Sequence, residues 1–346
     1  MPGLPADLGL AAFVLLFTLS AAAVAGSGIV LARTGDTIAE RTGLGGLVVG
    51  MFLLAGATSL PEIATDVSAA LAGAPDLAVG DLFGSSMANM AILALLDLVY
   101  RGRVWTRVGL GQARLAAIAI ALTCVALLAL LVPTTPAIGW VGIETIVIVV
   151  GYLAATAWIH RTRGSGRRES DGTGEIMVPT GWGEANEAGA SLRSVVVRFG
   201  LAAGVVLVAA PLVALSAQGI ANETGVGETF IGTFPLAITT SLPELVASLT
   251  AVRIGAHDLA VGNLFGSNAF NMVALFAADV AYTPGPILSA VAPAQAVAGV
   301  GAVLLMAVAL AAVIHGTETR IRRLEPDAVA LLLTYVLLLG AIWVST

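Results

Sequence analysis

Two glutamates, Glu62 and Glu244, lie in apolar stretches, each directly after the tetrapeptide Thr-Ser-Leu-Pro. An ionised carboxylate in such a stretch is costly unless it pairs with a charge, binds a cation or carries a proton. The proline before each glutamate deprives the carbonyl four residues earlier of its helical donor. Carboxylates, freed carbonyls and nearby hydroxyls make up the all-oxygen sites that hard cations such as Na⁺ and Ca²⁺ prefer. The pattern therefore predicts cation coordination at two related positions.

The two glutamates belong to a segment that occurs twice, at residues 58–100 and again at 240–282. The copies align without a gap, and 22 of 43 positions are identical. Both contain Thr-Ser-Leu-Pro-Glu, Asp-Leu-Ala-Val-Gly, Leu-Phe-Gly-Ser and Asn-Met. Such self-similarity indicates an internal duplication. A duplicated carboxylate in a membrane protein is typical of a transporter built from two repeats that share one site.

The composition places these segments in a membrane. Hydrophobic residues make up 58% of the chain and charged residues 11%, with a mean hydropathy of +0.96. Since a spanning helix needs roughly 20 apolar residues, the sequence predicts an all-α polytopic membrane protein with ten spans. We expect them at residues 8–32, 44–71, 77–100, 108–132, 138–160, 195–217, 229–253, 258–282, 288–315 and 326–344.

The basic residues predict how the chain is oriented. All sixteen are arginines, and each falls in or beside an odd-numbered connection between the expected spans. Cytoplasmic connections of membrane proteins carry the excess of basic residues. We therefore expect the odd-numbered connections in the cytoplasm, both termini on the extracytoplasmic side, and a multi-pass protein of the plasma (inner) membrane.

This topology gives the repeat a direction. Glu62 falls on the second expected span and Glu244 on the seventh. Because the two spans are five apart in order, an odd number, the two copies run through the membrane in opposite directions. The sequence thus predicts two five-helix repeats of inverted topology. They cover residues 1–161 and 193–346, with signature regions 55–100 and 237–282, and a polar cytoplasmic loop at 162–192 joins them.

Helix geometry predicts the depth of the duplicated residues. Glu62 lies about ten residues from the end of its span, and at 1.5 Å per residue this is roughly 15 Å. The hydrocarbon core is about 30 Å thick, so Glu62 is expected near its middle. The same reasoning places Ser85, Glu244 and Ser267 at a similar depth. Two carboxylates and several hydroxyls should therefore meet at the midplane.

These motifs resemble a known family. Gly-Ala-Thr-Ser-Leu-Pro-Glu at 56–62 with Gly-Ser-Ser-Met-Ala-Asn at 84–89, and their counterparts at 239–244 and 266–271, are similar to the two alpha-repeats of the sodium/calcium exchangers. The repeats cover about 86 of the 346 residues. The resemblance implies secondary active antiport of Na⁺ for Ca²⁺ by alternating access, with four ion sites at the centre. It also implies that the first and sixth spans slide against the other eight.

The resemblance further implies roles for individual residues. Glu62 and Glu244 would bridge the ion sites, and the carbonyls of Thr58 and Thr240 would complete a Ca²⁺ site. Four serines and two alanine carbonyls would line Na⁺ sites, and two asparagines would border the middle site. These residues are Ser59, Ser85, Ser241, Ser267, Ala55, Ala237, Asn89 and Asn271.

Two aspartates depart from the family pattern. Where relatives usually carry a small or hydroxyl residue the chain has Asp66, and where they carry asparagine it has Asp81, whereas the second copy keeps Ser248 and Asn263. Both aspartates are expected one turn outward of the central positions, on facing helices. We consider two interpretations: an acidic outer vestibule or proton-sharing pair, and a local hydrogen-bonded pair that stabilises the helical hairpin.

Other functions were weighed against sodium/calcium exchange. The nearest alternative is a proton-coupled divalent cation (Ca²⁺/H⁺) antiporter. An intramembrane protease would need a second aspartate in a suitable context, whereas the second copy has Asn263 at the position of Asp81. A channel would need a continuous pore and uncoupled flux, which the inverted repeat disfavours. We expect no enzymatic activity and no cofactor. The expected partners are membrane lipid and inorganic cations, and nucleic acid is not expected to bind. The coupling ion and the oligomeric state stay open.

Overall fold

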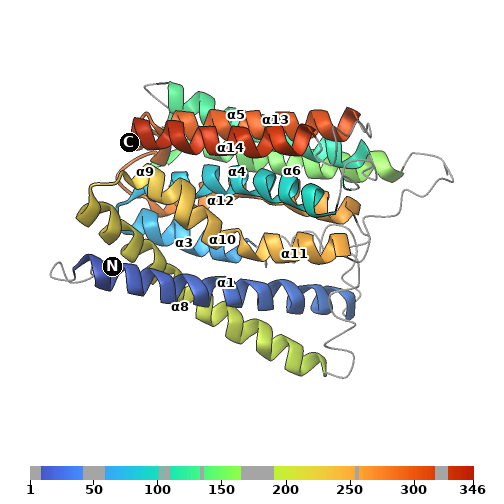
Figure 1. The fold of residues 1–346 in the computed structure, drawn as a ribbon, viewed down its shortest axis with the longest axis horizontal. Coiled ribbons are helices and arrows are strands. Elements are labelled where there is room, and N and C mark those ends of the chain that lie inside the picture. The colour runs from blue at the N-terminus through green and yellow to red at the C-terminus, as the bar shows by residue number, and fades with distance from the viewer. Residues whose placement is uncertain are drawn as a thin grey trace.

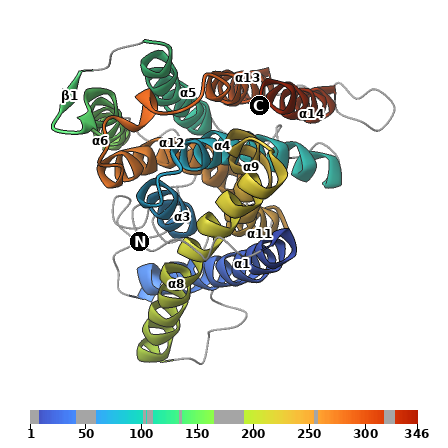
Figure 2. The same ribbon diagram turned by 90° about the vertical axis from the view of Figure 1, so that its left-hand side faces the viewer.

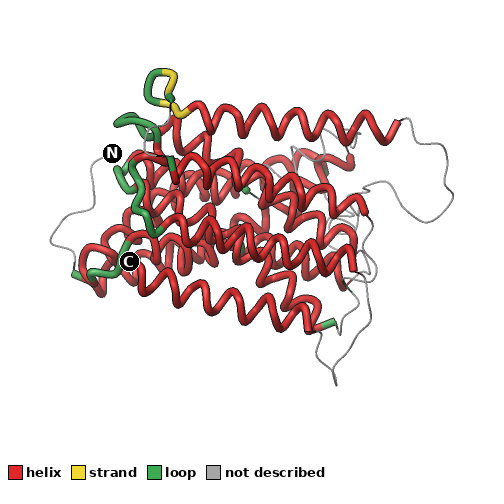
Figure 3. The backbone as a smooth tube through the Cα atoms, turned by 90° about the horizontal axis from the view of Figure 1, so that it is seen from above, coloured by secondary structure: helices red, strands yellow, loops and turns green. Residues whose placement is uncertain are grey.

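The computed structural model describes residues 9–41, 59–100, 104, 110–132, 136–164, 191–253, 257–315 and 326–346. These form a bundle in which most of the long helices lie side by side (Figures 1 and 3). Seven of the described helices are long and apolar enough to cross a membrane, and an eighth span results if one bent pair is counted. The protein is therefore an all-helical polytopic membrane protein.

The described elements follow one another with short connections in several places. They are α1 (Leu10–Arg41), α3 (Leu60–Leu71), α4 (Pro75–Val99), α5 (Leu110–Leu131), β1 (Ala137–Ile138), β2 (Val141–Gly142), α6 (Ile143–Gly164), α8 (Leu192–Thr224), α9 (Glu228–Ile231), the π-helix η2 (Gly232–Leu236), α10 (Ala237–Thr240), α11 (Leu242–Arg253), α12 (His257–Ala281), the 3-10 helix η3 (Ile287–Ser289), α13 (Gln295–His315) and α14 (Pro326–Ser345).

The predicted count of ten spans is reached only in part. Helix α6 contains a shorter apolar stretch, Ile143–Ile159, and α3 corresponds to the second half of the span expected at 44–71. Residues 42–58 and 165–190, which carry the rest of that span and most of the loop, lie outside the described residues. The ten-span count, the two five-helix repeats and the loop boundaries thus stay predictions.

Helices α1 and α8 form a pair at one side of the bundle (Figure 2). They pack against each other along much of their length, and they touch the rest through α3, α10 and α11. On the opposite side, α5, α13 and α14 cover α4 and α12 (Figure 2). Helices α4 and α12 therefore lie at the centre, and 83% of the most apolar window of α4 is buried.

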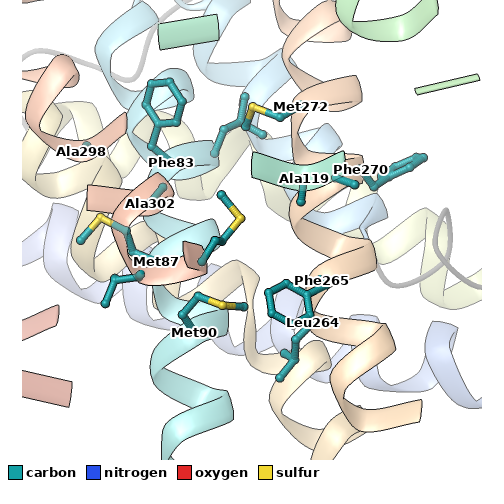
Figure 4. Packing of buried hydrophobic residues seen from close by; sticks show 14 of the residues in the cluster. Phe83, Met87, Met90, Ala119, Leu264, Phe265, Phe270, Met272, Ala298 and Ala302 are labelled. Atoms are coloured by element: carbon teal, nitrogen blue, oxygen red, sulfur yellow. The ribbon is translucent and has the colours of Figure 1, made fainter. Parts of the chain in front are cut away.

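Large apolar side chains fill the space between the central helices. Figure 4 shows Met90 of α4 near Phe265 of α12, and Phe83 and Met87 of α4 beside Ala302 of α13. All five are almost completely buried. Lipid is as apolar as these side chains, so close packing rather than the hydrophobic effect holds membrane helices together. This packing fixes the two helices that carry half of the candidate site.

The span expected at 229–253 is broken. It consists of α9, η2 and α10, followed after a bend of 45° by α11. Pro235 lies inside η2 and Pro243 lies at the start of α11. Each proline removes one backbone donor and crowds the preceding turn, which accounts for both irregularities. A π-bulge next to a break is a frequent feature of functional sites in helices.

Glycines bring the broken span into backbone contact with α4. A Cβ added to Gly84 would lie 2.4 Å from the carbonyl oxygen of Thr233, and one added to Gly232 would lie 2.7 Å from that of Leu77. Small residues that allow two backbones to approach are typical of membrane helix interfaces. The duplicated Gly-Ser motif thus positions η2 and α10 against α4.

We predict that Gly84→Ala destabilises the protein by about 1–3 kcal/mol. The added methyl group would clash with backbone atoms of Thr233, which cannot move aside by a change of rotamer as a side chain can. Thermal unfolding of the purified protein in detergent measures the effect. Gly204→Ala is the matched control, since a Cβ there would have no atom within 4 Å. Equal unfolding temperatures for the two variants would show that this contact is looser than the structure indicates.

Candidate cation site

The two duplicated glutamates meet at the centre of the bundle. Glu62 of α3 and Glu244 of α11 are completely buried, and their carboxyl groups lie close to one another. Two ionised carboxylates so close together repel each other unless a proton or a cation compensates their charge. The structure confirms that the two copies bring their glutamates together, although they are 182 positions apart in the sequence.

Both glutamates occupy the first turn of a half-helix. Helix α3 begins directly after Ser59, and α11 directly after Ser241, with a proline and then the glutamate in the first turn. The N-terminal end of a helix carries a partial positive charge that stabilises an anion. Half-helix ends near the midplane are a common way for transporters to build ion sites. The break therefore helps to keep each carboxylate in place.

A chain of hydroxyls joins the two repeats beside the glutamates. The hydroxyls of Ser85 on α4 and Thr240 on α10 are 3.2 Å apart. The Thr240 hydroxyl donates to Oδ1 of Asp81 at 3.0 Å. On the other side, Ser267 of α12 donates to Oε1 of Glu244 at 3.3 Å. Ser85 and Thr240 thus form a polar group with Asp81, and Ser267 forms a second one with Glu244.

Asp66 and Asp81 form a second carboxyl pair beside these polar groups. Both are completely buried, and their carboxyl groups lie close to one another. Neither lines an open vestibule in this conformation. At the matching place in the second repeat, the amide Nδ2 of Asn263 donates to the Ser248 hydroxyl at 3.2 Å. The two repeats therefore share a scaffold but differ in ionisable groups.

Asparagines close the far side of the site. The amide of Asn89 donates to Oδ1 of Asn268 at 2.8 Å, and Asn268 in turn donates to the carbonyl of Ser86 at 3.2 Å. Asn271 is completely buried, and neither of its side-chain polar atoms has a hydrogen-bond partner. These contacts again link α4 with α12. The predicted border of the site is thus made of residues from both copies.

Many buried oxygens at this place lack a hydrogen-bond donor. A buried polar group without a partner costs free energy, and most such groups in proteins are satisfied. Most of the unpartnered buried oxygens among the described residues belong to side chains of the candidate site and its neighbours, whereas Glu144 Oε1 and Gln295 Oε1 lie on other helices. Those of the site are Ser59 Oγ, Glu62 Oε1 and Oε2, Thr65 Oγ1, Asp66 Oδ1 and Oδ2, Asp81 Oδ2, Asn89 Oδ1, Ser241 Oγ, Glu244 Oε2 and Asn271 Oδ1. Cations would satisfy them.

Some predicted ligands lie outside the described residues, and one already accepts hydrogen bonds within the protein. Ala55 and Thr58 lie outside the described residues. The carbonyl of Ala237 already accepts from the backbone amide of Ser241 at 3.0 Å and from the Thr240 hydroxyl at 3.2 Å. It would have to lose one of these contacts to coordinate an ion. In the described part of the chain, no three histidine, cysteine, aspartate or glutamate side chains converge on one point, so hydroxyls, amides and carbonyls would complete any coordination shell.

Sequence reasoning missed two contributors. Thr65 of α3 is completely buried and its hydroxyl is unpartnered; its spacing of three residues from Glu62 was a usable signal, because such residues share a helix face. Asn268, which the sequence analysis does not single out, holds the Asn89 side chain. Its offset of 182 from Ser86 did not reveal that the two positions touch across the repeats.

Comparisons with known proteins identify the family of the chain. A family model described as sodium/calcium exchanger protein matches residues 12–159 and 194–344. The inner membrane protein YrbG of Escherichia coli K12 is 29% identical over 246 residues, which are 71% of this chain and 72% of that protein. The putative antiporter CaxA of Alkalimonas amylolytica is 29% identical over 301 residues, 84% of this chain and 86% of CaxA.

Solved structures share the fold. The H⁺/Ca²⁺ exchanger CAX has a TM-score of 0.69 at 15% identity, over 96% of this chain and 86% of CAX. The sodium-calcium exchanger NCX_Mj has a TM-score of 0.57 at 20% identity, over 95% of this chain and 97% of NCX_Mj. The family match covers most of the sequence, including both glutamates and both half-helices that carry them. The chain belongs to the sodium/calcium exchanger protein family of cation antiporters.

Proposed function

We propose that this protein exchanges Na⁺ for Ca²⁺ by alternating access. The observation that carries the proposal is the meeting of Glu62 and Glu244, completely buried, with hydroxyl and amide oxygens from both repeats around them. Hard cations prefer such oxygen sets. Two carboxylates are compensated equally by one Ca²⁺ or by several Na⁺. An empty, doubly charged site is costly to bury. The protein would therefore switch the side of the membrane to which the site is open only when the site holds ions, and this couples the two fluxes.

The test is uptake of ⁴⁵Ca²⁺ into Na⁺-loaded proteoliposomes of the purified protein. Uptake should require internal Na⁺ and should be absent when Na⁺ is replaced by choline or when the liposomes lack protein. A proton gradient alone should drive none. Uptake that depends on the proton gradient and ignores Na⁺ would refute sodium coupling.

Proton-coupled Ca²⁺ exchange is the second candidate, and one observation favours it. The Glu62–Glu244 pair and the Asp66–Asp81 pair each bring two buried carboxyls close together, and such pairs can hold protons that an arriving cation would release. Relatives of both kinds share the fold. The same proteoliposomes distinguish the two candidates, since an acid-inside gradient without Na⁺ drives uptake only in a proton-coupled exchanger.

The proposal includes a location. We place the protein in the plasma (inner) membrane with both termini outside, on the basis of the arginine distribution. Cysteine accessibility offers a direct check, because the chain has one native cysteine, Cys124. In a Cys124→Ser background, a cysteine introduced at position 346 should react with a membrane-impermeant maleimide in whole cells. No reaction before the membrane is opened would reverse the orientation.

A further inference from the structure

Four oxygen-bearing side chains from three helices converge beside the central glutamates. Asp66 comes from α3, Asp81 and Ser85 from α4, and Thr240 from α10. The Asp66 and Asp81 carboxyls lie close to one another, the Thr240 hydroxyl donates to Asp81 Oδ1 at 3.0 Å, and the Ser85 hydroxyl is 3.2 Å from that of Thr240. The set combines carboxylates with hydroxyls, as cation sites for hard ions do.

The carboxyl oxygens of this set are short of donors. All four side chains are completely buried. Both oxygens of Asp66 and Oδ2 of Asp81 have no hydrogen-bond donor, so the protein itself leaves three acceptors unsatisfied. The Asp66 carboxyl is directed at Asp81, its contact across the helix pair. Buried carboxylates are retained when a cation or a proton neutralises them.

The second repeat shows that the scaffold does not need these charges. Ser248 and Asn263 occupy the positions equivalent to Asp66 and Asp81. There Asn263 Nδ2 donates to the Ser248 hydroxyl at 3.2 Å, and that hydroxyl lies 3.4 Å from the Ala260 carbonyl. A neutral pair thus joins α11 and α12, the helices equivalent to α3 and α4. The aspartates of the first repeat therefore require an explanation beyond the packing of the hairpin.

We propose that Asp66 and Asp81, with the hydroxyls of Thr240 and Ser85, bind a Ca²⁺ ion of their own. Two carboxylates balance its charge, and Ca²⁺ accepts the mixed, irregular oxygen shell that these side chains offer. The position lies one helical turn from Glu62 and Ser85, towards the turn between α3 and α4. It exists only in the first repeat, so the exchanger is asymmetric across its two halves.

The shared residues give this position a role. Thr240 contacts both Asp81 and Ser85, and Asp81 lies near both central glutamates. The carboxylates of Asp66 and Asp81 attract cations into this part of the protein, next to the transport site. This role rests on the proposed exchange of Ca²⁺, whereas the binding itself does not.

Equilibrium dialysis with ⁴⁵Ca²⁺ on the purified, detergent-solubilised protein tests the binding. The variant Asp66→Ser/Asp81→Asn gives the first repeat the pair that the second already carries. It should bind one Ca²⁺ fewer per chain than the wild type, whereas Glu62→Gln should retain that ion. Asp66→Asn alone, which keeps the side chain's shape, should weaken binding at this position at least about tenfold, because it removes one of the ligand charges.

The outcomes separate this proposal from the proposed function. Unchanged Ca²⁺ stoichiometry and affinity in both aspartate variants would overturn the site. A changed pH dependence with unchanged Ca²⁺ binding would also overturn it, since the pair would then serve protons alone. If the double variant binds one Ca²⁺ fewer than the wild type, but the wild type shows no Na⁺-dependent uptake, the proposed site is supported and sodium exchange is refuted.

Discussion

Replacing Glu62 with glutamine should reduce Na⁺-dependent ⁴⁵Ca²⁺ uptake by about two to three orders of magnitude. Glutamine keeps the shape of the side chain but removes one of the two charges that compensate the ion. Breaking a buried charge pair by removing one partner costs about 3–5 kcal/mol, and each 1.4 kcal/mol corresponds to a factor of ten. Initial rates in proteoliposomes with equal protein content measure the loss, and Glu244→Gln should behave alike because the two carboxyls lie close together.

The control is the same substitution outside the site. Glu223 near the end of α8 is exposed, so Glu223→Gln should exchange at the wild-type rate. Size-exclusion chromatography in detergent shows whether each variant is folded. Folded Glu62→Gln protein that transports Ca²⁺ at the rate of Glu223→Gln would remove this glutamate from the ion path, and with it the observation on which the proposed function depends.

The sequence predicted the centre of the molecule well because duplication is visible without a structure. The identical positions of the two copies pair Glu62 with Glu244 and Ser85 with Ser267. Burying all four at one place follows from the high cost of an isolated carboxylate in an apolar segment. The structure confirms this convergence and places the broken helix where Pro243 occurs. The expectation drawn from composition, an all-helical membrane protein, is also confirmed.

Features that depend on contacts between the copies were harder to predict. The length of an apolar stretch predicts a span but not the breaks within it. The sequence therefore predicts a single helix at 229–253, whereas the structure has η2 and a bend of 45° there. The apolar pattern cannot say that Gly84 lies against Thr233, because the two are on different helices. Nor could it tell whether Asp66 and Asp81 face an open vestibule; the packing of α3 on α4 decides that they are buried.

One contact links helix α1 to both halves of the site. Gly28 lies where a Cβ would be 2.5 Å from Cγ of Pro243 and 3.1 Å from Cγ of Pro61. These are the prolines that precede the two glutamates, so α1 rests on both half-helices at once. A proline ring cannot rotate away as a flexible side chain can. The backbone of α1 therefore packs directly against the two proline rings, and this is possible because residue 28 has no side chain.

Gly28→Ala should lower the exchange rate about tenfold or more without unfolding the protein. The added methyl disfavours the conformation with α1 seated on the prolines by about 1–3 kcal/mol. If this conformation belongs to the transport cycle, its population falls accordingly. Gly26→Ala, two residues away, has no atom within 4 Å of the new Cβ and should exchange normally. Equal rates for the two variants, measured as initial ⁴⁵Ca²⁺ uptake, would show that exchange proceeds without α1 seated on the two prolines.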